Sequence, residues 1–98
     1  MNILLICSAG MSTSMVVKKM QEAAAQKGIE ATIWAVGDAE TATNIGKADV
    51  IMLGPQVRFM KDRIEGLAEG KPVLVIDMAD YGRMNGEKIL EDALAAKA

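Results

Sequence analysis

Apolar residues in this 98-residue chain gather in short blocks that alternate with longer segments of helical character. Three of the blocks are continuously apolar, which is typical of strands buried on both faces of a parallel sheet. A fourth block alternates apolar and polar positions, as an edge strand does. The pattern predicts strands over residues 2–6, 29–35, 49–53 and 72–76, with 29–35 as the alternating one. A helix is predicted after each strand, over residues 13–27, 38–45, 57–68 and 85–97.

Glycine, proline and short polar residues mark the boundaries of these elements. Gly28 is placed to end the first helix in a left-handed conformation, and Asp38 and Asn85 are placed to cap the amino ends of later helices. Gly54 and Pro55 stop the third strand. Residues 7–12 and 77–82 are predicted to be loops.

Strand and helix alternate along the whole chain, so residues 1–98 are predicted to form one α/β domain with right-handed crossovers. The alternating strand belongs at an edge, which gives the strand order 2-1-3-4 with helices on both faces of the sheet. This is a four-stranded version of flavodoxin-like winding. Such folds bind ligands at the carboxyl ends of the strands, where the strand order reverses. Loops 7–12 and 54–57 should meet there.

The loop after the first strand and the start of the next helix have the composition of a phosphate cradle. Small residues allow several backbone N–H groups to point inward, and the amino end of the helix adds free N–H groups and a positive dipole. The hydroxyl side chains add further donors. The segment consists of Cys7, Ser8, Ala9, Gly10, Met11, Ser12, Thr13 and Ser14.

Cys7 lies at the entrance of this predicted cradle, and the donors that would bind a phosphoryl group would also stabilise its thiolate. We therefore interpret Cys7 as a nucleophile that forms a phosphocysteine. The alternative is a small buried apolar residue that ends a strand. Met11, at the tip of the loop, is predicted to be an exposed and adaptable contact for partner proteins.

Composition excludes several other kinds of site. The chain has one cysteine and no histidine. It therefore lacks the ligands for a structural zinc site, cannot form a disulfide within the chain, and has no Ser-His or Cys-His catalytic pair. A formal charge of −2 argues against nucleic-acid binding. Because no disulfide framework is possible, a reducing cytosol is predicted. The first residues are not expected to form a signal peptide, and no apolar run is long enough to span a membrane. No metal or cofactor is expected.

The segment also resembles the C-x₅-R signature of the small tyrosine phosphatases, but Thr13 occupies the position of the arginine. An arginine fork there would stabilise the phosphoryl oxygens while water attacks. Without it, hydrolysis of a phosphocysteine should be slow. That property suits a phosphoryl carrier better than a phosphatase.

The stretch ICSAGMSTS after the first strand, with LGPQV after the third and VIDMADYGRMNG near the end, resembles the enzyme IIB component of the bacterial sugar phosphotransferase system. The likeness is to the lactose, cellobiose and N,N′-diacetylchitobiose class and covers the whole chain. It implies that Cys7 accepts a phosphoryl group from a phosphohistidine of enzyme IIA. It further implies transfer to a sugar, such as a β-disaccharide, bound by the membrane component enzyme IIC.

Supporting roles are less well defined by the sequence. Gln56 follows the third strand. Its side-chain amide is placed either to reach the cradle or to form a hydrogen bond with the backbone of its own loop. Tyr81 is placed either beside the cradle or in ordinary packing. Asp77 and Asp80 follow the fourth strand, where the small phosphatases place an acid, but Asp77 is expected to end the strand or cap a turn.

Two other functions are compatible with the predicted winding. One is a small phosphatase or arsenate-reductase-like hydrolase, which Thr13 and the single cysteine disfavour. The other is a non-catalytic flavin or nucleotide-binding module. The chain has only three aromatic residues, which are too few to suit the packing of a flavin ring. We expect a monomer, because transient docking needs a free active face.

Overall fold

The computed structural model describes residues 1–8 and 11–97, apart from the side chains of Met11 and Ser12. Its strands form one parallel sheet in the order β2-β1-β3-β4, which confirms the predicted winding. The strands are β1 (Asn2–Ile6), β2 (Thr32–Val36), β3 (Val50–Leu53) and β4 (Val73–Val75). β2 is at an edge, as its alternating pattern predicts.

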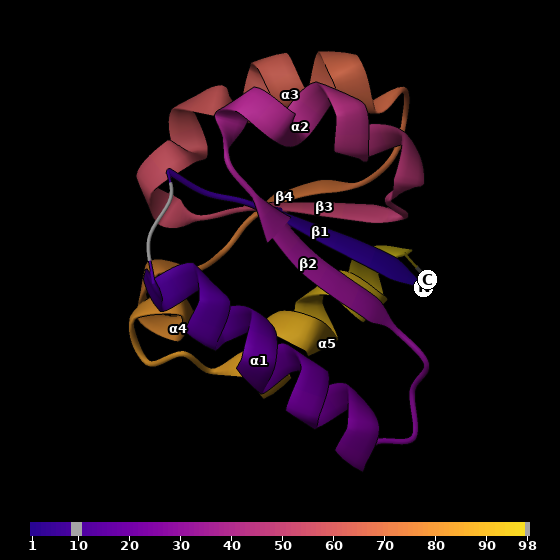
Figure 1. Cartoon of the computed structure of the whole chain (residues 1–98), viewed down its shortest axis with the longest axis vertical. Coiled ribbons are helices and arrows are strands. Elements are labelled where there is room, and N and C mark those ends of the chain that lie inside the picture. The colour runs from indigo at the N-terminus through magenta and orange to yellow at the C-terminus, as the bar shows by residue number, and fades with distance from the viewer. Residues whose placement is uncertain (9–10, 98) are drawn as a thin grey trace.

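Helices cover both faces of the sheet (Figure 1): α1, α4 and α5 lie on one side, and α2 and α3 on the other. The α-helices are α1 (Met11–Gln26), α2 (Asp38–Asn44), α3 (Lys61–Ala68), α4 (Met78–Gly82) and α5 (Gly86–Lys97). Two 3₁₀ helices, η1 (Ile45–Lys47) and η2 (Pro55–Met60), precede β3 and α3.

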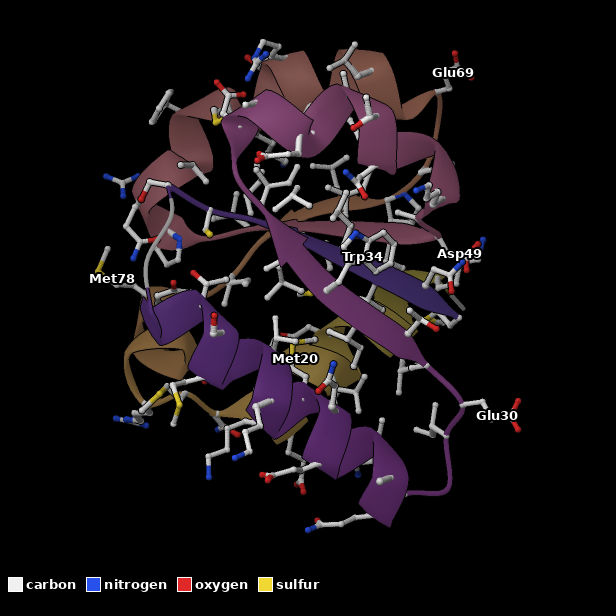
Figure 2. The ribbon with its side chains drawn as sticks, viewed as in Figure 1. Met20, Glu30, Trp34, Asp49, Glu69 and Met78 are labelled. Carbon is white, nitrogen blue, oxygen red and sulfur yellow. The ribbon has the colours of Figure 1, made fainter. Side chains whose placement is uncertain are left out.

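The central strand β1 divides the core into two layers. Ile3 and Leu5 belong to the apolar cluster shared with α1 and α5, whereas Leu4 and Ile6 belong to the cluster shared with α3. All four side chains are at most 1% exposed. Because successive strand residues point to opposite faces, a strand with helices on both sides must be apolar throughout. In Figure 2, Met20 of α1 lies between that helix and the sheet.

Several predicted boundaries are confirmed. Gly28 follows α1 with φ of +69°, the left-handed conformation expected of a residue that ends a helix. Asn85 Oδ1 accepts a hydrogen bond from Lys88 N at 3.3 Å, so Asn85 caps α5.

Several local predictions are wrong. The strand predicted over residues 29–35 begins three residues later, at Thr32. The first helix begins at Met11, two residues early, so the loop before it is shorter than expected. Gly37, not Asp38, is the N-cap of α2; Asp38 lies in the first turn and pairs with Arg63 of α3. The helix predicted over residues 57–68 is divided into η2 and α3, and η2 itself is kinked at Val57, which has non-helical backbone angles (φ −116°, ψ 22°).

The predicted loop over residues 77–82 contains α4. Asp77 is its N-cap: the carboxylate accepts hydrogen bonds from Ala79 N at 2.9 Å and Asp80 N at 3.2 Å. A helix of five residues has too few turns to show periodicity, so its cap and its packing stabilise it instead.

The approach of α5 to α1 depends on Gly86, and replacing it with alanine tests this contact. An added Cβ would lie 2.4 Å from the carbonyl carbon of Lys19 and 2.5 Å from the nitrogen of Met20. Backbone atoms cannot move aside without separating the helices. We expect Gly86→Ala to lower the free energy of unfolding by about 1–3 kcal/mol in urea denaturation.

Gly66→Ala in α3 is the matched control, since no atom outside its own helix turn lies within 4 Å of that Cβ position. It should stabilise the protein by about 0.5–1 kcal/mol, because alanine loses less backbone entropy than glycine on folding. Equal stability of the two variants would refute the close α1–α5 contact.

Candidate functional site

Cys7 is the first residue beyond the carboxyl end of β1. Its backbone nitrogen donates to the Val36 carbonyl oxygen at 3.1 Å, and its Sγ lies 3.9 Å from the same oxygen. The residue is 6% exposed. The hydrogen bonding of β1 to β2 therefore continues through Cys7, and the edge of the sheet fixes its backbone.

Gly54 lies beside Cys7 on the opposite side, after β3. Its nitrogen donates to the Ile6 carbonyl oxygen at 2.9 Å. A Cβ at Gly54 would lie 3.7 Å from the Cβ of Cys7 and 3.6 Å from the Ile6 oxygen. The two segments expected to meet where the strand order reverses do so at Cys7 and Gly54.

Gln56 belongs to η2, and its side chain is turned back over Gly54. Its Oε1 lies 2.9 Å from the position that a Cβ on Gly54 would occupy. The side chain is exposed. Gln56 therefore lies next to Gly54, and the contact of its amide with the cradle stays a prediction.

A buried hydroxyl pair joins α1 to α4. Thr13 Oγ1 and the Tyr81 hydroxyl oxygen are 2.7 Å apart, and the residues are 4% and 7% exposed. Thr13 occupies the position that an arginine has in the phosphatase signature. Sequence reasoning placed Tyr81 near the cradle as one of two options but did not find this contact. Only the docking of α4 against α1 brings together residues 68 positions apart.

The rest of the predicted cradle is described in part. Ser8 and Ser14 are exposed. Met11 and Ser12 begin α1, but their side chains lie outside the described residues, as do Ala9 and Gly10.

The charges around α1 favour an anion at its amino end. Its 16 residues contribute aligned peptide dipoles, and its first turn contains no acidic residue that would offset the positive end. The carboxylate of Asp77 is engaged as the N-cap of α4, which disfavours a role for it as a catalytic acid. The Asp80 nitrogen is bound by that same carboxylate.

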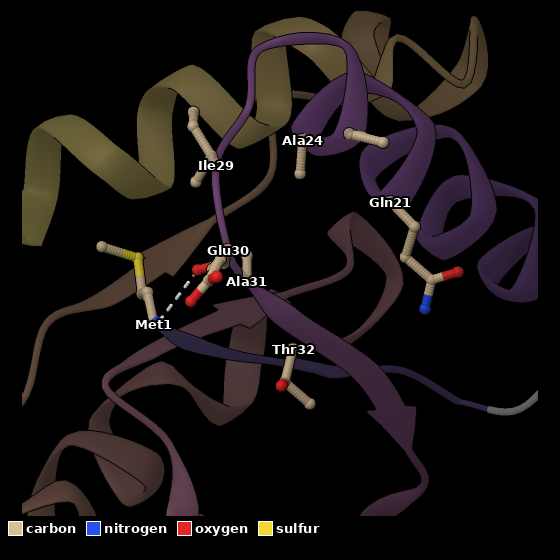
Figure 3. Close-up of a pocket in the computed structure, with 8 residues that line it drawn as sticks. Met1, Gln21, Ala24, Ile29, Glu30, Ala31 and Thr32 are labelled. Atoms are coloured by element: carbon tan, nitrogen blue, oxygen red, sulfur yellow. Dashed lines mark hydrogen bonds between the residues drawn. The ribbon is translucent and has the colours of Figure 1, made fainter.

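A hollow lies at the end of the sheet opposite Cys7 (Figure 3). It has a volume of about 490 Å³ and is lined by Met1, Gln21, Ala24, Ile29 and Glu30, among others. The terminal amine of Met1 donates to the Glu30 carbonyl oxygen at 3.2 Å. This hollow lies at the amino ends of β1 and β2, so it is separated from Cys7 by the length of the strands.

In the described part of the chain, no three His, Cys, Asp or Glu side chains are grouped so that they could hold a metal ion. None of the helices described there has both the length and the apolar character needed to cross a bilayer.

A parallel sheet in the order 2-1-3-4, with a cysteine leading into a helix where the order reverses, defines a flavodoxin-like domain with a candidate anion site. The chain belongs to the lactose/cellobiose-specific IIB subunit family of the PTS, the phosphotransferase system, whose family model matches residues 2–92.

Characterised relatives cover nearly the whole chain. The oligo-β-mannoside-specific EIIB component of Bacillus subtilis is 46% identical over 95 residues, which are 95% of this chain and 92% of that protein. The cellobiose-specific EIIB component of Lactococcus lactis subsp. lactis is 48% identical over 98 residues, covering 93% and 91%. The galactose-specific EIIB component of Lactococcus lactis subsp. cremoris shares the same identity and coverage.

Solved structures show the same fold. The solution structure of a cellobiose-specific IIB component from Borrelia burgdorferi has a TM-score of 0.81 at 46% identity, covering 98% of this chain and 90% of that one. The lactose-specific IIB domain from Streptococcus pneumoniae has a TM-score of 0.90 over 100% and 98% of the chains. Its identity of 19% makes it a match of fold alone.

Family membership confirms the resemblance stated from the sequence. EIIB components are phosphotransferases of sugar uptake, and they work with EIIA and EIIC components. The chain is therefore a phosphoryl-transfer protein rather than a hydrolase or a flavin module.

The Thr13–Tyr81 pair can be tested by a double-mutant cycle of Thr13→Val and Tyr81→Phe. Each single variant should lower the free energy of unfolding by about 1–2 kcal/mol, because the remaining buried hydroxyl loses this partner. The double variant should be less destabilised than the sum of the two, with a coupling energy of about 1 kcal/mol. Urea denaturation measures all three.

Thr43→Val is the control for removal of a threonine hydroxyl. The Thr43 hydroxyl donates to the Glu40 carbonyl oxygen on the exposed face of α2. This variant should stay within about 0.5 kcal/mol of the parent. Strictly additive effects of Thr13→Val and Tyr81→Phe would show that the two hydroxyls do not interact.

Proposed function

We propose that Cys7 carries the phosphoryl group in this phosphotransferase, receiving it from a phosphohistidine of enzyme IIA and passing it to a sugar bound by enzyme IIC. The observation that carries the proposal is the position of Cys7, between Val36 and Gly54 where the strand order reverses. The chain contains no histidine, so a phosphohistidine donor must belong to another protein.

Both steps are in-line displacements at phosphorus. In the first, the Cys7 thiol gives its proton to solvent, the thiolate attacks, an S–P bond forms and the N–P bond to the donor histidine breaks. In the second, a sugar hydroxyl attacks, the S–P bond breaks and the thiolate leaves, while the hydroxyl proton goes to a base outside this chain. Such reactions need mainly positioning and charge stabilisation.

The segment that follows Cys7 supplies the stabilisation. In the proposed complex, the backbone N–H groups of residues 8–13 and the amino end of α1 hold the phosphoryl oxygens. The absence of an acid from the first turn of α1 supports this role. The Gln56 amide, folded over Gly54, is a further donor, and Tyr81 positions Thr13 through its hydroxyl.

A neutral hydroxyl pair stands where a phosphatase has a guanidinium, and this favours a carrier. Thr13 and Tyr81 provide no positive charge to stabilise attack by water. A phosphocysteine at Cys7 should therefore persist until its acceptor arrives.

The named relatives indicate the class of sugar. They are specific for oligo-β-mannoside, cellobiose and galactose. We propose a β-linked disaccharide such as cellobiose, chitobiose or lactose as the acceptor. The chain would act as a single monomeric IIB domain in the cytoplasm, with transient docking at the inner face of the membrane.

Phosphorylation of Cys7 is tested by intact-mass measurement. The protein is incubated with phosphoenolpyruvate, the general phosphotransferase proteins and a lactose/cellobiose-class enzyme IIA. We expect a gain of one phosphoryl group, lost completely in Cys7→Ser because a serine hydroxyl is a far weaker nucleophile at neutral pH.

Thr43→Ala, which removes an exposed hydroxyl from α2, outside the predicted cradle, is the control and should still be phosphorylated. Enzyme IIA proteins of several sugar classes should be tried, so that a mismatched donor is not mistaken for an inactive acceptor. A phosphoryl group retained by Cys7→Ser would place the site elsewhere.

A further inference from the structure

A small apolar pocket opens between η2 and α4. It has a volume of about 290 Å³ and is lined by Pro55, Gln56, Arg58, Met78, Tyr81 and Gly82. Met78 is 66% exposed, although it is a large apolar side chain. In Figure 2, Met78 projects outward at one side of the molecule.

Two of the residues that line the pocket adjoin residues of the candidate site. One wall begins at Pro55, directly after Gly54, whose Cβ position is in contact with Cys7. The opposite wall contains Tyr81, whose hydroxyl bonds Thr13 in the first turns of α1. A molecule seated here would therefore contact residues that adjoin the candidate site.

The polarity of the residues that line the pocket indicates what kind of molecule it can bind. Most of the lining is apolar; its polar side chains are Gln56, Arg58 and Tyr81, whose hydroxyl is hydrogen-bonded to Thr13. A disaccharide has many hydroxyls and would find few partners there. An apolar protein side chain fits, and an exposed methionine is an adaptable contact for one.

Arg58 is the only charged side chain among the described residues that line the pocket. Its Nη1 donates to the Pro55 carbonyl oxygen at 3.0 Å, which holds the guanidinium at the rim. A fixed cation there complements a partner that arrives with negative charge. The donor, enzyme IIA, arrives carrying a phosphoryl group.

We propose that this pocket receives an apolar side chain of phosphorylated enzyme IIA, while Arg58 attracts the negative charge around its phosphohistidine. This inference rests on the proposed function. It makes Met78 and Arg58 docking residues, which affect the association of the two proteins rather than the transfer step.

The test measures phosphoryl transfer from the enzyme IIA that phosphorylates the parent protein, using Met78→Ala and Arg58→Gln. Each variant should raise the KM at least about fivefold, as expected for a side chain central to an interface, with the maximal rate unchanged. The KM of Arg58→Gln should also depend less on ionic strength than that of the parent.

Leu67→Ala and Arg63→Gln are the matched controls, and neither residue lines the pocket. Leu67 is an exposed apolar residue of α3, 45% exposed, and Arg63 is an exposed arginine paired with Asp38. Both controls should keep the KM of the parent. Circular dichroism and urea denaturation of all four variants separate docking from folding.

Full phosphorylation with unchanged KM in Met78→Ala and Arg58→Gln would overturn this inference and leave the proposed function intact. Defects confined to transfer from the phosphorylated protein to sugar would assign the pocket to enzyme IIC and overturn it as well. A parent protein that accepts no phosphoryl group from any enzyme IIA would overturn the proposed function and this inference together.

Discussion

The burial of β1 between two parallel neighbours is the constraint on which the rest of the structure depends. β1 pairs with β2 on one side and β3 on the other, and its residues from Ile3 to Ile6 are at most 1% exposed. The chain can leave such a strand only at its carboxyl end, where both neighbours also end. Cys7 is the first residue past that end. The hydrophobic energy that holds Ile6 in place therefore also fixes the candidate nucleophile.

The same constraint explains why much of the fold could be predicted from the sequence. A strand covered by helices on both faces must be apolar at every position, and a strand at an edge need not be, so β1, β3 and β2 could be told apart by pattern alone. Elements that are stabilised by non-local contacts could not be predicted from the sequence in this way. Neither the five residues of α4 nor the kink at Val57 leaves a periodic signal.

The candidate site was likewise predictable where it follows from strand order, and not where it depends on non-local contacts. The approach of Cys7 and Gly54 follows from strand order, because parallel strands bring their carboxyl ends to one edge. The Thr13–Tyr81 hydrogen bond does not follow, since it requires α4 to exist and to dock on α1. Asp77 connects the two levels: it was expected to end the strand or cap a turn, and the helix that it does cap brings Tyr81 to Thr13.

The neutral character of that hydroxyl pair has a consequence for the proposed mechanism. An arginine at position 13 would stabilise developing charge whether water or a partner attacked, so transfer and hydrolysis would be accelerated together. In the proposed mechanism, backbone amides, Thr13 and Tyr81 orient the phosphoryl group but carry no formal positive charge. Part of the electrostatic stabilisation must then come from outside the cradle, from the partner itself. Transfer becomes conditional on docking, and a carrier with this arrangement protects its phosphoryl group between partners.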